Sequence, residues 1–165
     1  MEPVSEELVE ETWQETAGFN PKQISKVIKN VGASQPHLLT FILECTQDLD
    51  QEVKELAVYM FLNLYRMFRK GFKKKIKKIS ANEIIKCYEQ NEKFIASLEG
   101  AHDKFYDRIA RVELSEQPYV MKYVLDTFFE VSDDENPLSL TDDDTGYLFL
   151  LFKTVIDILN KITDS

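Results

Sequence analysis

Residues 51–79, QEVKELAVYMFLNLYRMFRKGFKKKIKKI, decide the fold class because they carry one long apolar stripe at helical spacing. Apolar side chains recur every three or four residues, which places them on a single face of an α-helix. The stripe is formed by Val53, Leu56, Ala57, Met60, Phe61, Leu64, Phe68, Phe72 and Ile76. The spacing predicts an amphipathic helix that begins at Gln51 and that Gly71 kinks or ends.

Helix-start signals divide the rest of the chain into further amphipathic segments. A capping side chain, or a proline in the first turn, precedes each apolar pattern. These signals stand at Ser5, Asn20-Pro21, Ser34-Gln35-Pro36, Ser80, Ser115 and Thr141. The inward face of the first segment is expected to hold Leu8, Val9, Thr12 and Trp13. Residues 147–162 are apolar on most sides, so we expect this helix at the centre of the fold.

The composition agrees with a globular helical protein. Hydrophobic residues make up 44% of the 165 positions and aromatic residues 12%, which is too rich for a disordered chain. No stretch shows the period-two alternation of a strand, and five Gly and five Pro are few for a protein with many turns. We therefore predict an all-α fold of seven or eight helices in one domain, residues 1–165.

Charge and cysteine content indicate a cytoplasmic protein. The net charge of −9 disfavours general affinity for nucleic acid, although a local basic patch could override it. The N-terminal segment MEPVSEELVEE is acidic where a signal peptide needs basic residues, and no apolar stretch has the length of a membrane span. Cys45 and Cys87 form no CxxC motif and are expected to be buried, reduced thiols.

The two halves of the chain resemble each other when one is shifted by 82 residues. Residues 7–44 then align with residues 89–126 without a gap and share seven identities in 38 positions, where chance gives roughly two or three. The most informative match places Gln35-Pro36 on Gln117-Pro118. We therefore predict an internal duplication, with a first half at about residues 5–78 and a second at about residues 80–163.

A unit of 82 residues is twice 41, the length of a HEAT-type repeat. The segment DLDQEVKELA, residues 48–57, resembles the turn and second-helix start of such a repeat, and the resemblance extends over residues 36–68. It implies stacked helical hairpins, which would form a solenoid. The corresponding stretch of the second half, residues 140–146, lacks the pattern, so a compact pseudo-twofold bundle remains the alternative.

The familiar catalytic and metal-binding patterns are incomplete in this sequence. Glu99 and His102 have the spacing of a di-iron ligand pair, but His37, the other histidine, has no matching carboxylate. The tripeptide at residues 144–146 matches that of aspartic proteases but stands at a helix start, and the acidic segment at residues 132–144 does not have the spacing of an EF-hand. We therefore predict no catalytic site, metal or cofactor.

One basic amphipathic segment stands out against the acidic average. It comprises Arg66, Arg69, Lys70, Lys73, Lys74, Lys75, Lys77 and Lys78, interleaved with apolar residues. Such a segment can contact an acidic protein, nucleic acid or an anionic membrane surface. It can also be the solvated face of a long helix, or pair with the acidic loop of the same chain or of a second copy.

By elimination, the sequence favours a non-enzymatic helical module for protein–protein interaction. An anion-binding regulator that uses the basic segment on RNA, DNA or anionic lipid is the first alternative. An enzyme with a pocket of unfamiliar type is the second. Partner identity and oligomeric state, including a homo-oligomer, stay open at this point.

Overall fold

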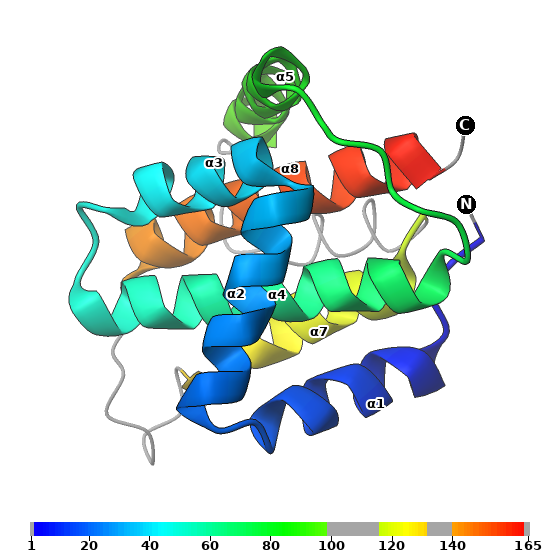
Figure 1. The fold of residues 1–165 in the computed structure, drawn as a ribbon. Helices are drawn as coiled ribbons and strands as arrows, with labels where there is room; N and C mark the ends of the chain where they lie inside the picture. Colours follow the sequence, from blue (N-terminus) through cyan, green and yellow to red (C-terminus); the bar gives the residue numbers. More distant parts are fainter. Residues whose placement is uncertain (1, 99–115, 132–139, 164–165) are drawn as a thin grey trace.

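The computed structural model describes residues 2–98, 116–131 and 140–163, and every regular element within these ranges is an α-helix (Figure 1). This confirms the predicted all-α class. The described ranges contain seven helices, the lower of the two numbers expected from the sequence. The helices are α1 (Glu6–Ala17), α2 (Pro21–Ser34), α3 (Pro36–Thr46), α4 (Gln51–Gly71), α5 (Ala81–Leu98), α7 (Pro118–Val131) and α8 (Asp142–Thr163).

The predicted capping residues hold the first turns of their helices. The backbone N–H of Ser80 donates to the Glu83 carboxylate at 2.9 Å, and the N–H of Glu83 donates to the Ser80 hydroxyl at 3.2 Å. Asn20 and Gln23 form the same reciprocal pair at the start of α2. Each pair satisfies backbone donors that have no partner within the helix, so the sequence fixes these starts locally.

Helices α4 and α8 form the centre of the fold. In α8 every side chain from Leu148 to Leu159 is buried except that of Asp157, which confirms the expectation of a central helix. Ten side chains of α4 are buried as well, from Val53 to Phe68. Each large apolar side chain that is fully buried contributes about 1.5–3 kcal/mol, so the residues that α4 and α8 bury against all their neighbours supply a large part of the stability.

The other helices cover this central pair from two sides (Figure 1). Helix α1 packs against α4 and α7, whereas α5 packs against α8 and α3. Helix α3 also packs against α4 and α8, and α7 packs against the same two helices. The first helix therefore contacts the second half of the chain, so the fold closes on itself as a bundle.

The contacts between helices have the symmetry expected if the two halves of the chain are related. If α1 corresponds to α5, α3 to α7 and α4 to α8, each contact among these helices has a counterpart: α1–α4 matches α5–α8, and α1–α7 matches α5–α3. This pattern supports the predicted duplication, which stays a prediction. The resemblance of residues 36–68 to HEAT-type repeats likewise stays a prediction.

Two buried glutamines connect the halves in equivalent ways. Gln35, before α3, accepts a hydrogen bond at 2.9 Å from the N–H of Ile79, which lies two residues before α5 begins. Gln117, before α7, accepts one at 2.9 Å from the N–H of Val4, two residues before α1 begins. Each glutamine thus anchors the segment that leads into the first helix of the other half.

The glutamine amide nitrogens are also satisfied. Gln35 donates from Nε2 to the carbonyl of Lys77 at 2.8 Å, and Gln117 donates from Nε2 to Oδ1 of Asn160 at 3.0 Å. Because both side chains are almost completely buried, loss of either amide would leave main-chain polar groups without a partner. The repeated Gln-Pro dipeptide therefore has a structural role in both positions.

None of the helices in the described ranges is both long enough and apolar enough to cross a membrane.

We expect Gln35→Leu and Gln117→Leu each to lower the free energy of unfolding by about 2 kcal/mol, since each strands a buried backbone N–H. Urea denaturation followed by circular dichroism measures the change. Gln14→Leu, on the exposed side of α1, is the matched control and should shift stability by less than about 0.5 kcal/mol. Equal, small effects of all three substitutions would contradict the anchoring role.

Candidate functional site

The structure divides the predicted basic segment into two parts. Helix α4 ends at Gly71, and residues 72–80 form a non-helical connection to α5. The predicted stripe therefore continues past the end of the helix: Phe72 and Ile76 belong to the connection, where Ile76 is still buried. Arg66, Arg69 and Lys70 lie on α4, and the five lysines at positions 73, 74, 75, 77 and 78 lie exposed on the connection.

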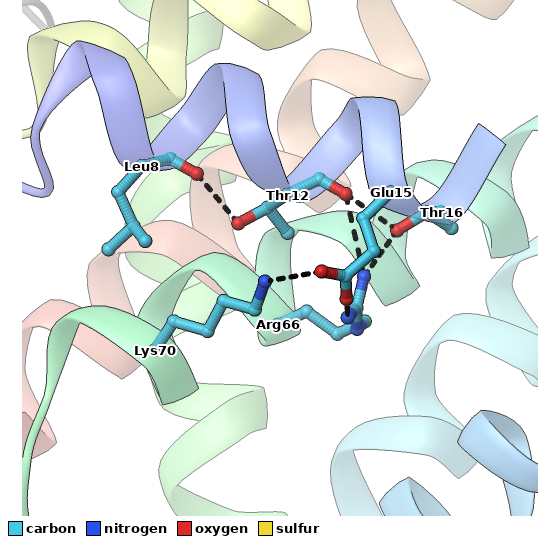
Figure 2. A network of polar contacts seen from close by, with 6 residues as sticks. All are labelled: Leu8, Thr12, Glu15, Thr16, Arg66 and Lys70. Atoms are coloured by element: carbon cyan, nitrogen blue, oxygen red, sulfur yellow. Dashed lines mark hydrogen bonds and ion pairs between the residues drawn. The ribbon is translucent and has the colours of Figure 1, made fainter. Parts of the chain in front are cut away.

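Arg66 and Lys70 belong to a polar network between α4 and α1 (Figure 2). The Arg66 guanidinium forms an ion pair with Glu15 and donates to the hydroxyl of Thr16 at 2.6 Å. It also lies over the ring of Phe19, 4.9 Å from the centroid. Lys70 reaches the second Glu15 oxygen at 3.2 Å. These two cations join helices, and their contact with an external partner stays a prediction.

The ion pairs shift the titration of Glu15. Hydrogen bonds from Arg66 and then from Lys70 favour the ionised carboxylate and hold its pKa below 4.5, against a smaller opposing effect of burial. Because Glu15 is largely exposed, solvent screens much of this interaction.

Four of the six remaining basic residues border a hollow beside the C-terminal ends of α2 and α4, which we call the basic hollow. Its volume is about 630 Å³. The lining residues are Ala33, Ser34, Tyr65, Arg69, Lys75, Ile76, Lys77 and Lys78. Lys73 and Lys74 are exposed beside it but do not line it. Burial raises the pKa of Tyr65, and the Arg69 charge and a hydrogen bond with Ser34 oppose the rise.

A second hollow, which the sequence did not indicate, lies between α1, α4 and α7. We call it the acid–aromatic groove, and its volume is about 360 Å³. Four aromatic side chains and four carboxylates line it, together with a single cation. The lining residues are Glu6, Val9, Glu10, Trp13, Leu56, Tyr59, Tyr119, Lys122, Tyr123, Asp126, Thr127 and Glu130.

Two of the groove's aromatic rings are exposed. Trp13 and Tyr119 are each 38% exposed, and they account for two of the four large hydrophobic side chains exposed in the described ranges. Trp13 was predicted to face the core with Val9 and Thr12. Its neighbours are buried as predicted, but the indole lies at the edge of that face and borders the groove.

Helical spacing aligns the groove's carboxylates in two pairs. Glu6 and Glu10 are one turn apart on α1, and Asp126 and Glu130 are one turn apart on α7. The one lining cation, Lys122, forms an ion pair with Glu6 at 3.5 Å. The groove therefore carries a net negative charge. The local signal that the sequence carried was the one-turn spacing of the acids within each pair, and nothing in the sequence shows that the two pairs meet.

Tyr123 links the groove to the core. The buried Asn63 donates from Nδ2 to the Tyr123 hydroxyl at 2.9 Å, whereas Oδ1 of Asn63 has no hydrogen-bond partner within the described residues. Burial is the main reason why the pKa of Tyr123 is raised well above its usual value. The phenol therefore stays neutral near neutral pH, and the groove's charge comes from its carboxylates.

A buried cation between α5 and α8 is a further feature that the sequence did not reveal. Lys153 donates to Oδ1 of Asn91 and to the Asp157 carboxylate, both at 2.7 Å, and its Nζ lies 5.0 Å from the centroid of the Phe94 ring. Nearby, burial raises the pKa of Cys87 to about 11, so this thiol is protonated at neutral pH. The group joins two helices and borders neither hollow.

The other candidate motifs fall into two classes. Glu99 and His102 lie outside the described residues. Residues 144–146 lie in the first turn of α8, where the N–H of Asp144 donates to the Thr141 hydroxyl at 3.0 Å, so they form part of a helix cap. Within the described ranges, no group of three or more His, Cys, Asp or Glu side chains is placed to hold a metal ion.

Comparison with known proteins finds no protein-family model, no curated protein and no solved structure that matches this chain. The assignment of function therefore depends on the two hollows and the residues around them.

We expect Arg66→Met to lower the free energy of unfolding by about 1–2 kcal/mol, because it removes the partly buried hydrogen bonds to α1 and the contact with Phe19. Lys70→Met, which removes only the more exposed ion pair, should cost less than about 0.5 kcal/mol. Chemical denaturation of the two variants measures this difference. A larger loss in Lys70→Met would contradict the assigned network.

The stability advantage of wild type over Glu15→Gln should depend on pH. The pKa of Glu15 is lower in the folded than in the unfolded state, so its contribution is fully present above about pH 4.5 and disappears as the pH falls through the folded-state value. Denaturation curves between neutral and acidic pH measure the difference. Glu11→Gln, on the same helix, is the control, and its difference from wild type should lack this trend.

Proposed function

We propose that this protein is a non-enzymatic interaction module that binds a positively charged segment of a partner protein in the acid–aromatic groove. The observation that carries the proposal is the exposure of Trp13 and Tyr119 within a groove bordered by four carboxylates. Soluble proteins seldom leave such rings exposed together unless the surface makes a contact.

The aromatic side chains supply the apolar part of the contact. Tryptophan and tyrosine dominate the binding energy of protein interfaces because they bury a large area and lose little conformational entropy. In the groove, Trp13 on α1 and Tyr119 on α7 flank Leu56 and Tyr59 of α4. A side chain inserted between the two outer helices would therefore contact apolar surface on three sides.

The carboxylates determine which partner the groove can accept. They oppose an acidic segment and attract lysine or arginine, and the rings add cation–π attraction of about 0.5–2 kcal/mol. The ion pair between Lys122 and Glu6 is exposed on both sides. Such pairs contribute little, so Lys122 can move away from Glu6 when another cation arrives.

Size and chemistry support a binding role over a catalytic one. A hollow of about 360 Å³ accommodates one or two side chains of a partner, with the rest of the contact on the surrounding helix faces. Neither histidine nor cysteine is among its lining residues, so the groove lacks the Ser–His or Cys–His pair of acyl-transfer enzymes. The resemblance of residues 36–68 to HEAT-type repeats points to the same class of function.

A cytoplasmic setting is part of this proposal. Cys45 and Cys87, the only cysteines of the chain, are both free and partly buried. Free thiols are maintained in a reducing compartment.

Trp13 is the only tryptophan, so its fluorescence reports directly on the groove. We expect a short peptide that places lysine or arginine beside leucine to change this fluorescence with saturation, and a peptide with glutamate in place of the cations to have no effect. Tyr119→Ala and Asp126→Lys should each weaken binding about tenfold or more. Leu43→Ala, which removes an exposed apolar side chain outside the groove, is the matched control.

The same titration distinguishes other occupants. Saturation by tetramethylammonium as tight as that by the peptide would mean that the groove binds a small cation. Concentration-dependent self-association in sedimentation, abolished by Asp126→Lys, would mean that a second copy of the chain is the partner. Binding of basic and acidic peptides with equal affinity would contradict the proposed role of the carboxylates.

A further inference from the structure

The basic hollow is independent of the groove and suits a different kind of ligand. Two elements place its cations: Arg69 comes from the last turn of α4, and Lys75, Lys77 and Lys78 come from the connection to α5. No carboxylate is among its lining residues. The hydroxyls of Ser34 and Tyr65 add two neutral groups that can donate hydrogen bonds.

The backbone that carries the three lysines is held in place. Gln35 binds the carbonyl of Lys77 and the N–H of Ile79, and the side chains of Ile76 and Ile79 are buried beneath the connection. Lysines on a fixed backbone lose less conformational freedom on binding than lysines on a free loop. The hollow is thus partly organised before any ligand arrives.

The cations of the hollow differ from the neighbouring cations of α4. Arg66 and Lys70 share the single carboxylate of Glu15, whereas Arg69 and the three lysines form no ion pair within the described residues. Four like charges around one hollow repel each other, which costs stability in the absence of a counterion. An arrangement of this kind is typical of a site for a multiply charged anion.

We propose that the basic hollow binds a compact anion that carries two or more phosphate groups. Arg69 supplies a planar fork for two phosphate oxygens, and the three lysines that also line the hollow supply point charges. A compact ligand is favoured over a nucleic-acid strand because the chain as a whole carries 29 acidic against 20 basic residues and would repel an extended backbone. A soluble polyphosphate and a phosphorylated lipid headgroup share this chemistry.

A purely structural role for the same residues predicts a different outcome. Cations near the ends of α2 and α4 also complement the negative ends of the helix dipoles. In that case, replacing them with neutral residues would lower stability. In a site built for an anion, the same replacement relieves repulsion, so the unliganded protein is unchanged or more stable.

The test compares wild type with two matched variants, using sodium tripolyphosphate as the probe. Lys75→Gln/Lys77→Gln/Lys78→Gln removes three cations of the hollow, and Lys73→Gln/Lys74→Gln removes two exposed lysines beside it. We expect tripolyphosphate to raise the unfolding temperature of wild type and of the double variant. The triple variant should bind at least about tenfold more weakly by calorimetry and be as stable as wild type without ligand.

Further probes identify the source of the phosphate groups. Recruitment of the protein to vesicles that contain a phosphorylated lipid headgroup, competed by tripolyphosphate, assigns the hollow to a membrane ligand; tripolyphosphate binding without recruitment assigns it to a soluble one. Trp13→Ala should bind tripolyphosphate normally, which separates this site from the groove. Equal affinity for orthophosphate, equal losses in both lysine variants, or tighter binding of single-stranded RNA would overturn the proposal.

Discussion

The burial of α4 and α8 on more than one side is the constraint on which the rest of the molecule depends. Both helices are apolar on more than one side, so neither can lie at the surface, and the other helices must cover them. Helix α1 then meets α7 over one side of α4, and the acid–aromatic groove is the space that remains where these three helices meet. The groove is thus a product of the central packing.

Helix starts were predictable because caps and apolar periodicity are properties of adjacent residues, as Ser80 and Glu83 illustrate. The end of α4 at Gly71 was one of two predicted outcomes, a kink or an end, and the sequence left both open because Phe72 and Ile76 continue the helical spacing. The apolar side chain of Ile76 is removed from water in the extended connection, just as it would be on the inner face of a continued helix. The buried amide of Gln35 favours the extended form, because it binds backbone groups of Lys77 and Ile79 that a continued helix would use internally.

The basic segment was recognisable from composition, but its division was not. Arg66 and Arg69 are one turn apart on α4, yet Arg66 binds Glu15 of α1 and Arg69 borders the basic hollow. Only the tertiary packing decides which cations are neutralised, since Glu15 lies far away in the sequence. The exposure of Trp13 was missed for a related reason. Periodicity identifies the inward face of α1, but it does not show how much of that face the neighbouring helices cover.

The predicted duplication gives the groove a counterpart for comparison. If the halves are related, the α1–α7 contact corresponds to α5–α3, and Tyr123 corresponds to Phe41. Phe41 meets Tyr88 of α5 edge to face at 5.7 Å between ring centroids, so two aromatic rings contact each other on that side. At the α1–α7 side, the equivalent position borders a hollow with an exposed tryptophan and four carboxylates. If the halves are related, the same position makes a ring–ring contact in one half and borders an acidic, aromatic hollow in the other, so the two helix pairs differ in the side chains that they place there.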